Sequence, residues 1–191
     1  PTTTTSSRTT EQNGEGMPQH PAGFEVYPAD RFIEIIKAWI THPWPMTPIQ
    51  AKELYESFGY RVHTPKPSLF FSEFAQEEPD SFFTAQHNRV GNVRISVSRP
   101  CAARTQQDEN RISHVFTEYC AIIDSSLRDS ISQRKTEESS IRWTLDNDIE
   151  IRLAKLPRNI SLRIASPRMT QLLREEREMG LTCYDEILED D

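Results

Sequence analysis

Three short segments in the second half of the chain alternate between apolar and polar residues, and they constrain the fold more than any other feature. They span 141–145, 149–154 and 160–165, and each places its large apolar residues on one face. The sequences between them, DND at 146–148 and PRN at 157–159, are typical of tight turns. We therefore expect an antiparallel sheet that is covered on one side and solvated on the other. The charged residues of the expected solvated face are Arg142, Glu150, Arg152 and Arg163.

Helical periodicity is present in several other segments, where apolar residues recur every three or four positions. The first predicted helix covers 30–40, and the longest runs over 108–131. A further helix is expected at 48–58, because Thr47 is a good N-cap and Gly59 suits the position after a helix end. These signals indicate helices both before and between the predicted strands.

The first half of the chain contains weaker strand signals. Short aromatic or alternating runs, separated by acidic or glycine-containing turns, predict four strands. These runs cover 60–63, 68–74, 81–87 and 93–98, with a hairpin turn at 88–92. The segment 132–140 is largely polar, and we expect it to be a linker.

The order of these elements predicts an α+β fold, with one or two antiparallel sheets packed against a long central helix and helices at both ends. Two helix-plus-strands units follow each other, 47–98 and 108–166. We expect a single α+β domain over 23–191, after a disordered tail at 1–22 that is rich in Thr, Ser, Gly and Pro. An acidic C-terminal helix and tail would occupy 167–191.

The charge of the chain is concentrated near its C-terminal end. The 191 residues include 29 Asp or Glu and 22 Lys or Arg, for a formal charge of −7, and residues 173–191 account for six of these negative charges. This balance argues against direct nucleic-acid binding, for which a basic face is usual. No apolar run approaches the roughly 18 residues of a membrane span. Three widely spaced cysteines favour a reducing, cytoplasmic location.

Residue patterns for catalysis do not occur in the sequence. It has no Gly-x-Ser-x-Gly motif and no glycine-rich phosphate loop, and its five histidines lie at neither i,i+4 nor His-x-His spacing. Adjacent acids such as Glu137 and Glu138 lie in polar runs, where solvated charge is expected. We therefore predict a non-enzymatic protein with no cofactor and no metal.

Two features remain as candidate contact surfaces for a partner protein. One is an aromatic cluster rimmed by acids, which suits an interface, although packing in the core is the alternative interpretation. The other is the acidic C-terminal segment, which would attract a basic partner, although a solubilising helix is the alternative. The residues of the first are Phe70, Phe71, Phe74, Glu77, Glu78 and Asp80, and those of the second are Glu175, Glu176, Glu178, Asp185 and Glu186.

The second half, from the long helix through IRWTLDNDIEIRLAKLPRNISLRIASP to REEREMGLTCYDEILEDD, resembles small actinobacterial domains of unknown function. Those domains are thought to act as immunity proteins of polymorphic toxins or of toxins exported by type VII secretion. The likeness covers 32–191 and is one of pattern. It is carried by the strand around Trp143, the hairpin, the strand that ends at Ser166 and Pro167, and the Glu-rich last helix. It implies a cytoplasmic inhibitor of a cognate toxin, whose cleft would be basic where it acts on nucleic acid or nucleotides.

Two other functional classes stay open. Class I secretion chaperones are small, acidic α+β proteins with a similar order of helices and sheet, and the aromatic region at 70–83 would hold an extended segment of a client. The third class is an enzyme without a recognisable motif. Cys101 follows Pro100 in a loop and could be reactive, although an ordinary semi-exposed thiol is the alternative interpretation. The sequence leaves the oligomeric state open.

Overall fold

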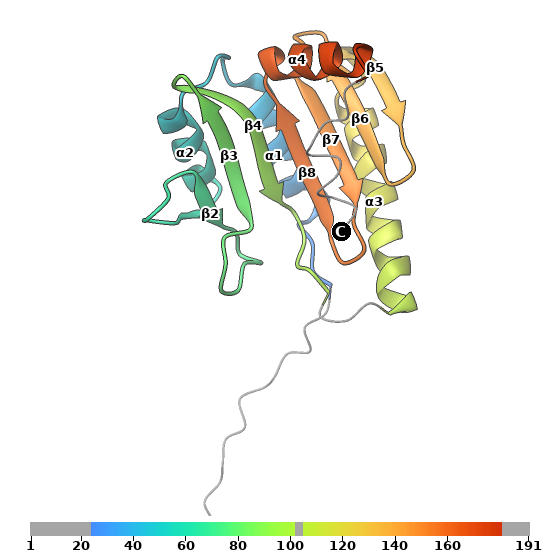
Figure 1. Cartoon of the computed structure of the whole chain (residues 1–191). Coiled ribbons are helices and arrows are strands. Elements are labelled where there is room, and N and C mark those ends of the chain that lie inside the picture. Colours follow the sequence, from blue (N-terminus) through green and yellow to red (C-terminus); the bar gives the residue numbers. More distant parts are fainter. Residues whose placement is uncertain (1–23, 102–104, 181–191) are drawn as a thin grey trace, which may run out of the picture.

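The computed structural model describes residues 24–101 and 105–180, and these form one eight-stranded antiparallel sheet and four α-helices (Figure 1). The sheet order is β1-β2-β3-β4-β8-β7-β6-β5. The helices are α1 (Ala29–Thr41), α2 (Pro48–Ser57), α3 (Gln106–Ser126) and α4 (Pro167–Glu178), with a short 3-10 helix η1 (Arg128–Ser130). The strands are β1 (Arg61–Val62), β2 (Leu69–Phe71), β3 (Ser81–Gln86), β4 (Arg89–Ser96), β5 (Ile131–Thr136), β6 (Ser140–Leu145), β7 (Glu150–Lys155) and β8 (Ile160–Ala165).

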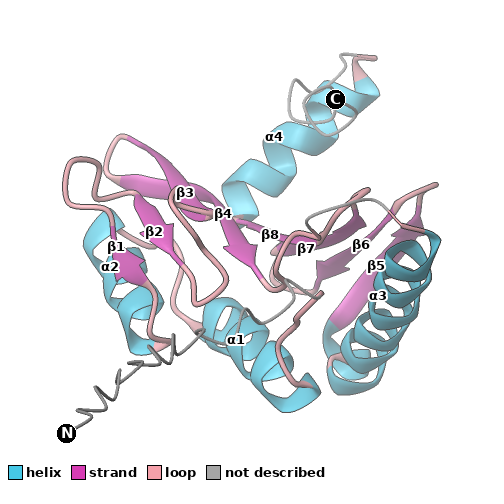
Figure 2. Cartoon of the chain, turned by 90° about the horizontal axis from the view of Figure 1, so that it is seen from below, coloured by secondary structure: helices cyan, strands magenta, loops and turns pink. Residues whose placement is uncertain are grey.

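Three helices cover one face of the sheet, and the fourth stands on the opposite side (Figure 2). α2 packs against the first strands, α3 runs beneath the β5–β7 half, and α1 lies between these two helices. The covered face is apolar and forms the core, in which Trp39 and Trp143 are completely buried. The predicted α+β fold is thus confirmed. Its long helix, α3, is only roughly central, because α1 shares the covered face with it.

The two helix-plus-strands units have the same connectivity. Each contributes one helix and a four-stranded meander, α2 with β1–β4 and α3 with β5–β8. The meanders join where their last strands pair antiparallel, from Asn92 opposite Ala165 to Ser96 opposite Ser161. This joint lies at the centre of the sheet, and the first strand of each unit forms an outer edge.

Local sequence explains the boundaries of α2. The hydroxyl of Thr47 accepts a hydrogen bond from the backbone N–H of Gln50 at 3.4 Å, and the side chain of Gln50 accepts one from the backbone N–H of Thr47 at 2.9 Å. This reciprocal capping box fixes the start of the helix, with Pro48 at its first position. Gly59 follows the helix end with φ +81°, a conformation that is open to glycine. Both predicted boundary signals are confirmed.

The hairpin turn in the first unit lies earlier than predicted. It consists of His87 and Asn88, whose φ angles of +51° and +60° are those of a two-residue hairpin turn. The prediction of a turn at 88–92 was therefore wrong, because β4 already begins at Arg89. Val90 is buried, so the strand pattern starts before the alternation that the sequence makes obvious.

The second unit differs from prediction at the end of its helix. α3 ends at Ser126 and not at 131, and the chain turns through η1 into β5. Most of the predicted linker at 132–140 is therefore a strand. β5 is an edge strand whose residues are nearly all exposed, and an edge of this kind tolerates the polar sequence that conceals its strand character.

Candidate functional site

A row of basic residues crosses the face of the sheet that α1, α2 and α3 leave open. Arg94 of β4 is opposite Arg163 of β8, and Arg163 is opposite Arg152 of β7. Arg142 of β6 and Lys135 of β5 continue the row. Five neighbouring strands thus carry a cation at one register position, where cross-strand neighbours lie roughly 5 Å apart. We call these five residues the basic row.

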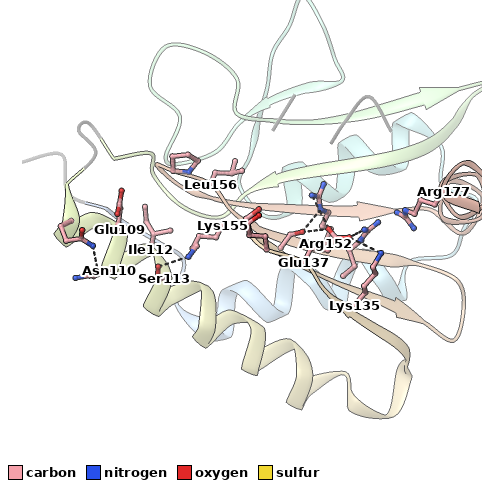
Figure 3. A pocket seen from close by; sticks show the side chains of 16 residues that line it. Glu109, Asn110, Ile112, Ser113, Lys135, Glu137, Arg152, Lys155, Leu156 and Arg177 are labelled. Atoms are coloured by element: carbon pink, nitrogen blue, oxygen red, sulfur yellow. Dashed lines mark hydrogen bonds and ion pairs between the residues drawn. The ribbon is translucent and has the colours of Figure 1, made fainter. Parts of the chain in front are cut away.

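The β5–β7 end of the basic row opens into a groove of about 970 Å³ (Figure 3). Its walls are the N-terminal half of α3, the β5–β6 and β7–β8 turns, and the end of α4. Lys155 links the sheet to α3, because its Nζ donates to Oγ of Ser113 at 3.3 Å. Basic side chains outnumber acidic ones in the lining. The cations are Lys135, Arg142, Arg152, Lys155 and Arg177, and the carboxylates are Glu109, Glu137 and Glu138.

Glu137 is the carboxylate at the centre of this charged cluster. It forms an ion pair with Arg142, and its oxygens lie 4.0 Å from Nη2 of Arg152 and 3.7 Å from Nζ of Lys135. Ser140 connects the same groups, since its hydroxyl donates to Glu137 at 3.0 Å and accepts from Nε of Arg152 at 3.3 Å. The four charged side chains therefore have an excess of two positive charges.

The sequence predicted that this face would be solvated, and the structure corrects that prediction. Only 5% of Arg142, 8% of Arg152 and 3% of Glu150 is exposed, and Arg163 is half-buried. The alternation of polar and apolar residues shows which residues share the polar face. It does not show whether other parts of the protein cover that face. Burying a guanidinium group is costly unless an anion lies beside it. At Arg142, Arg152 and Glu150, the charged groups of this face therefore form ion pairs.

The end of α4 reaches the same charged surface. Nη2 of Arg177 lies 3.5 Å from the carboxylate of Glu150, which projects from β7. Arg177 borders both the groove and an adjoining hollow that it shares with Arg142. Gly180 follows the end of α4 with φ +71°, a left-handed conformation that terminates the helix. The polypeptide thus leaves α4 next to the groove.

Most of the predicted aromatic cluster belongs to the core. Phe70 and Phe74 are 0% and 5% exposed, and the ring of Phe70 stacks on Tyr55 at a centroid distance of 4.1 Å. Phe71 points to the other side of β2 and is half-buried, with the guanidinium of Arg61 5.3 Å from its ring centroid. Core packing, the alternative interpretation, describes Phe70 and Phe74, which have no surface to offer a partner in the folded domain.

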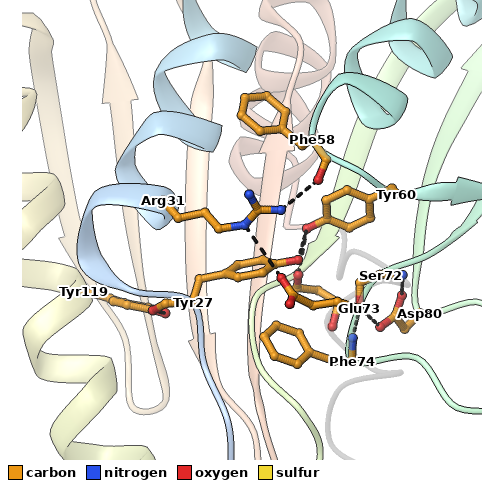
Figure 4. A network of polar contacts seen from close by, with 10 residues as sticks. Tyr27, Arg31, Phe58, Tyr60, Ser72, Glu73, Phe74, Asp80 and Tyr119 are labelled. Atoms are coloured by element: carbon orange, nitrogen blue, oxygen red, sulfur yellow. Dashed lines mark hydrogen bonds and ion pairs between the residues drawn. The ribbon is translucent and has the colours of Figure 1, made fainter.

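The acidic rim of that cluster divides into structural and exposed residues. Asp80 braces the loop between β2 and β3, because it accepts hydrogen bonds from the backbone N–H of Ser72, at 2.9 Å, and from the hydroxyl of Ser72 (Figure 4). Glu77 and Glu78 are exposed. The structure therefore does not bring these acids together with Phe70 and Phe74 into one contact surface.

A network of tyrosine hydroxyls lies next to this loop (Figure 4). Tyr27 donates to Tyr60 at 3.2 Å, Tyr60 donates to the carbonyl of Ser96 at 2.9 Å, and Tyr119 donates to the carbonyl of Tyr27 at 2.6 Å. Burial raises the pKa of Tyr60 and of Tyr119, which keeps both hydroxyls protonated. The network joins α3 and the segment before α1 to the sheet, and we assign it a structural role.

The described part of the C-terminal segment is not acidic overall. Glu175 and Glu178 are exposed on α4 and Glu176 is half-buried. Three basic residues of the same helix balance them, namely Arg168, Arg174 and Arg177. Asp185 and Glu186 lie outside the described residues. Most of the negative charge that the sequence placed at this end is therefore carried beyond α4.

The two described cysteines, Cys101 and Cys120, are both buried. Burial raises the pKa of Cys101 and raises that of Cys120 to about 12, which lowers the fraction of reactive thiolate. Cys101 is only 2% exposed. Within 24–101 and 105–180, no three His, Cys, Asp or Glu side chains are placed so that they could hold a metal ion. In these same ranges, no helix has both the length and the apolar character needed to cross a membrane.

The basic row was missed by sequence reasoning, although a local signal for it exists. An arginine flanked by apolar residues recurs in four strands, at 93–95, 141–143, 151–153 and 162–164. Each strand alone is consistent with a solvated polar face. The four arginines align only because β4 pairs with β8. These strands are far apart in the chain, and the sequence of neither strand indicates that they pair.

Most of the chain matches a known protein family. Residues 30–166 match the model of a family of unknown function, DUF6301. This range includes both helix-plus-strands units and the whole basic row, and it ends just before α4. No curated protein and no solved structure matches the chain.

Proposed function

Because the chain belongs to the DUF6301 family, whose function is unknown, its own surface has to indicate its role, and we propose that it is a non-enzymatic protein-binding module. The specific role that we propose is that of an immunity protein, which binds a cognate bacterial toxin in the cytoplasm and inhibits it. The observation that carries this proposal is the groove at the end of the basic row.

The groove suits a protein partner because its cationic side chains are already held in place. Glu137 and Ser140 fix the guanidinium groups of Arg142 and Arg152, so little side-chain freedom is lost when a partner binds. Lys135 and Arg177 of the same lining have side chains that are 61% and 30% exposed, so they can contact acidic groups of a partner directly. These properties favour the binding of a carboxylate-bearing protein surface.

The charges indicate which parts of the toxin would make contact. The basic row attracts acidic side chains of the toxin and would guide its approach. The basic cleft that the sequence predicts for the toxin would face the acidic residues at 181–191 instead. In this proposal the two surfaces of opposite charge give the complex its orientation as well as its rate of association.

A secretion-type chaperone is the second candidate, and the length of the basic row favours it. Five strands at a spacing of about 4.8 Å extend over about 19 Å. An extended peptide of about six residues has the same length. The row could therefore hold an extended acidic segment of a client, and binding at such a segment would not inhibit the client.

The test is to inspect the genes beside that of the chain and to co-express the full chain with any toxin-like gene found there. We expect the full chain to restore growth. Charge reversal of two groove residues, Lys135→Glu with Lys155→Glu, should weaken protection by about tenfold or more in the amount of protein required, as expected for about 1.4 kcal/mol of lost binding. The matched control is Lys37→Glu with Lys66→Glu, which makes the same charge change outside the groove lining.

The outcomes separate the candidates. Growth that is not restored, or equal protection by both double variants, overturns the immunity proposal at this site. Restored secretion or solubility of the neighbouring protein, without inhibition of its activity, supports the chaperone instead. A neighbourhood with no toxin-like gene also counts against immunity.

A further inference from the structure

The basic row sets like charges opposite one another on four successive strand pairs. Like charges that face each other directly across strands destabilise a sheet, so the row requires anions nearby. Glu137 contributes one carboxylate at the β5–β7 end, and Glu150 another beside Arg177. Cations still exceed carboxylates in the lining of the groove, and this excess selects a ligand rich in carboxylates.

The chain itself carries such a ligand directly after α4. Residues 181–191 contain five acids and no lysine or arginine, so they account for five of the seven formal negative charges. These residues lie outside the described part of the structure. The acids are Asp185, Glu186, Glu189, Asp190 and Asp191.

The position of α4 brings this segment within reach of the whole row. The helix ends beside the groove, where Arg177 lines it and the chain departs at Gly180. Eleven extended residues span up to about 36 Å, and the row crosses about 19 Å of sheet. A short tether also gives the segment an effective concentration in the millimolar range, roughly, so that even weak attraction keeps it bound.

We propose that the groove and the basic row form a binding site for an acidic polypeptide segment, and that residues 181–191 of the same chain occupy this site in the free protein. The carboxylates of the segment complement the excess of positive charge in the groove lining. A partner that uses the groove has to displace the segment. The inference concerns the isolated chain and holds whether the partner is a toxin or a client.

The lysines of the chain make a crosslinking test discriminating. There are five, and two of them, Lys135 and Lys155, line the groove. The other three are Lys37, Lys52 and Lys66, which do not. A zero-length carbodiimide reagent joins a carboxylate to a lysine amine only when the two are in contact. Treatment of the full chain, followed by peptide mass spectrometry, should link 185–191 to Lys135 or Lys155.

Two further conditions show whether the contact is electrostatic and within one chain. An equal mixture of ¹⁵N-labelled and unlabelled chains distinguishes links within a chain from links between chains. At about 1 M salt, where the Debye length is about 3 Å, the groove links should largely disappear. Links spread evenly over all five lysines, or links found only between chains, would overturn the proposal.

A peptide-binding measurement tests the same site without a crosslinking reaction. The probe is a fluorescein-labelled hexaglutamate peptide, and the variant neutralises the segment through Asp185→Asn, Glu186→Gln, Glu189→Gln, Asp190→Asn and Asp191→Asn. The control neutralises five exposed acids elsewhere, through Glu34→Gln, Glu53→Gln, Glu56→Gln, Glu77→Gln and Glu78→Gln. In the variant with the neutralised segment, residues 181–191 no longer compete for the groove. This variant should therefore bind the peptide about tenfold more tightly than the original chain.

Each result of the peptide experiment is decisive. A tenfold gain in the segment variant and less than a twofold gain in the control support the proposal. Equal gains in both variants indicate a general effect of net charge and overturn it. If none of the three proteins binds the peptide, the proposal that the groove binds an acidic segment is overturned. An immunity function through other contacts would be unaffected by that result.

Discussion

Removing the charge of Glu137 should destabilise the fold more than any other single change at a charged residue of the groove. In Glu137→Gln, the guanidinium groups of Arg142 and Arg152 lose a carboxylate while their side chains stay only 6% and 9% exposed. At the 4.0 Å separation from Arg152, one ion pair is worth about 4 kcal/mol at an effective dielectric constant of about 20. Breaking a buried pair from one side costs about 3–5 kcal/mol.

We expect the lower end of that range, a loss of about 3 kcal/mol in the free energy of unfolding. Glutamine keeps an oxygen that can accept the hydrogen bond from Ser140, and the side chain of Glu137 is itself 26% exposed. The contact with Lys135 adds little, because that side chain is 61% exposed and the pair is screened by water.

Urea unfolding at pH 7, followed by tryptophan fluorescence, measures this loss. The matched control is Glu138→Gln, which removes the same charge from the adjacent, exposed residue and should change the free energy by less than about 0.5 kcal/mol. A loss below about 1 kcal/mol for Glu137→Gln, or equal losses for the two variants, would refute the argument that Glu137 compensates buried cations.

Four further predictions concern the core and its boundaries. Tyr60→Phe leaves the carbonyl of Ser96 and the hydroxyl of Tyr27 each without one hydrogen bond, and thermal unfolding should show a loss of about 1–3 kcal/mol; an unchanged midpoint would contradict the network. Thr47→Ala removes the capping box of α2 and should cost about 1 kcal/mol in urea unfolding, whereas Thr47→Ser should cost much less. Because burial raises the pKa of Cys120 from 9.0 to about 12, its alkylation by iodoacetamide at pH 8 should be far slower in the folded chain than in urea. The same shift makes the free energy of unfolding fall as pH rises above 9.0, since the unfolded thiol ionises there and the folded one does not, and Cys120→Ala should reduce this slope.

The fold was largely predictable because its strongest elements are encoded locally. The alternating strands β6, β7 and β8 have apolar residues that face the core, and Thr47 and Gly59 mark the ends of α2 through their own backbone preferences. β5 was not predictable from its own sequence. As an exposed edge strand it needs no apolar residues. Its backbone pairing with β6, and not its composition, makes this segment a strand.

The candidate site was much less predictable, for a physical reason that the aromatic cluster also illustrates. In a strand, Phe70 and Phe71 must point to opposite faces, so the sequence shows that one of them leaves the core but not which one. The structure buries Phe70. In the same way, the arginines could be assigned to a polar face, whereas their alignment and burial depend on strand order and on what packs over the sheet.

The repeated connectivity of the two units makes the asymmetry of the site informative. Beyond Arg94, the register position of the basic row is occupied by Phe82 of β3 and Leu69 of β2, which correspond to Arg152 of β7 and Arg142 of β6. The groove is lined only by residues from α3 onward. The second unit therefore carries the site, while β4 of the first unit pairs with β8 and prevents it from becoming an exposed edge. At these two corresponding positions the second unit carries arginines and the first unit carries apolar residues, and this difference favours a binding role for the second unit.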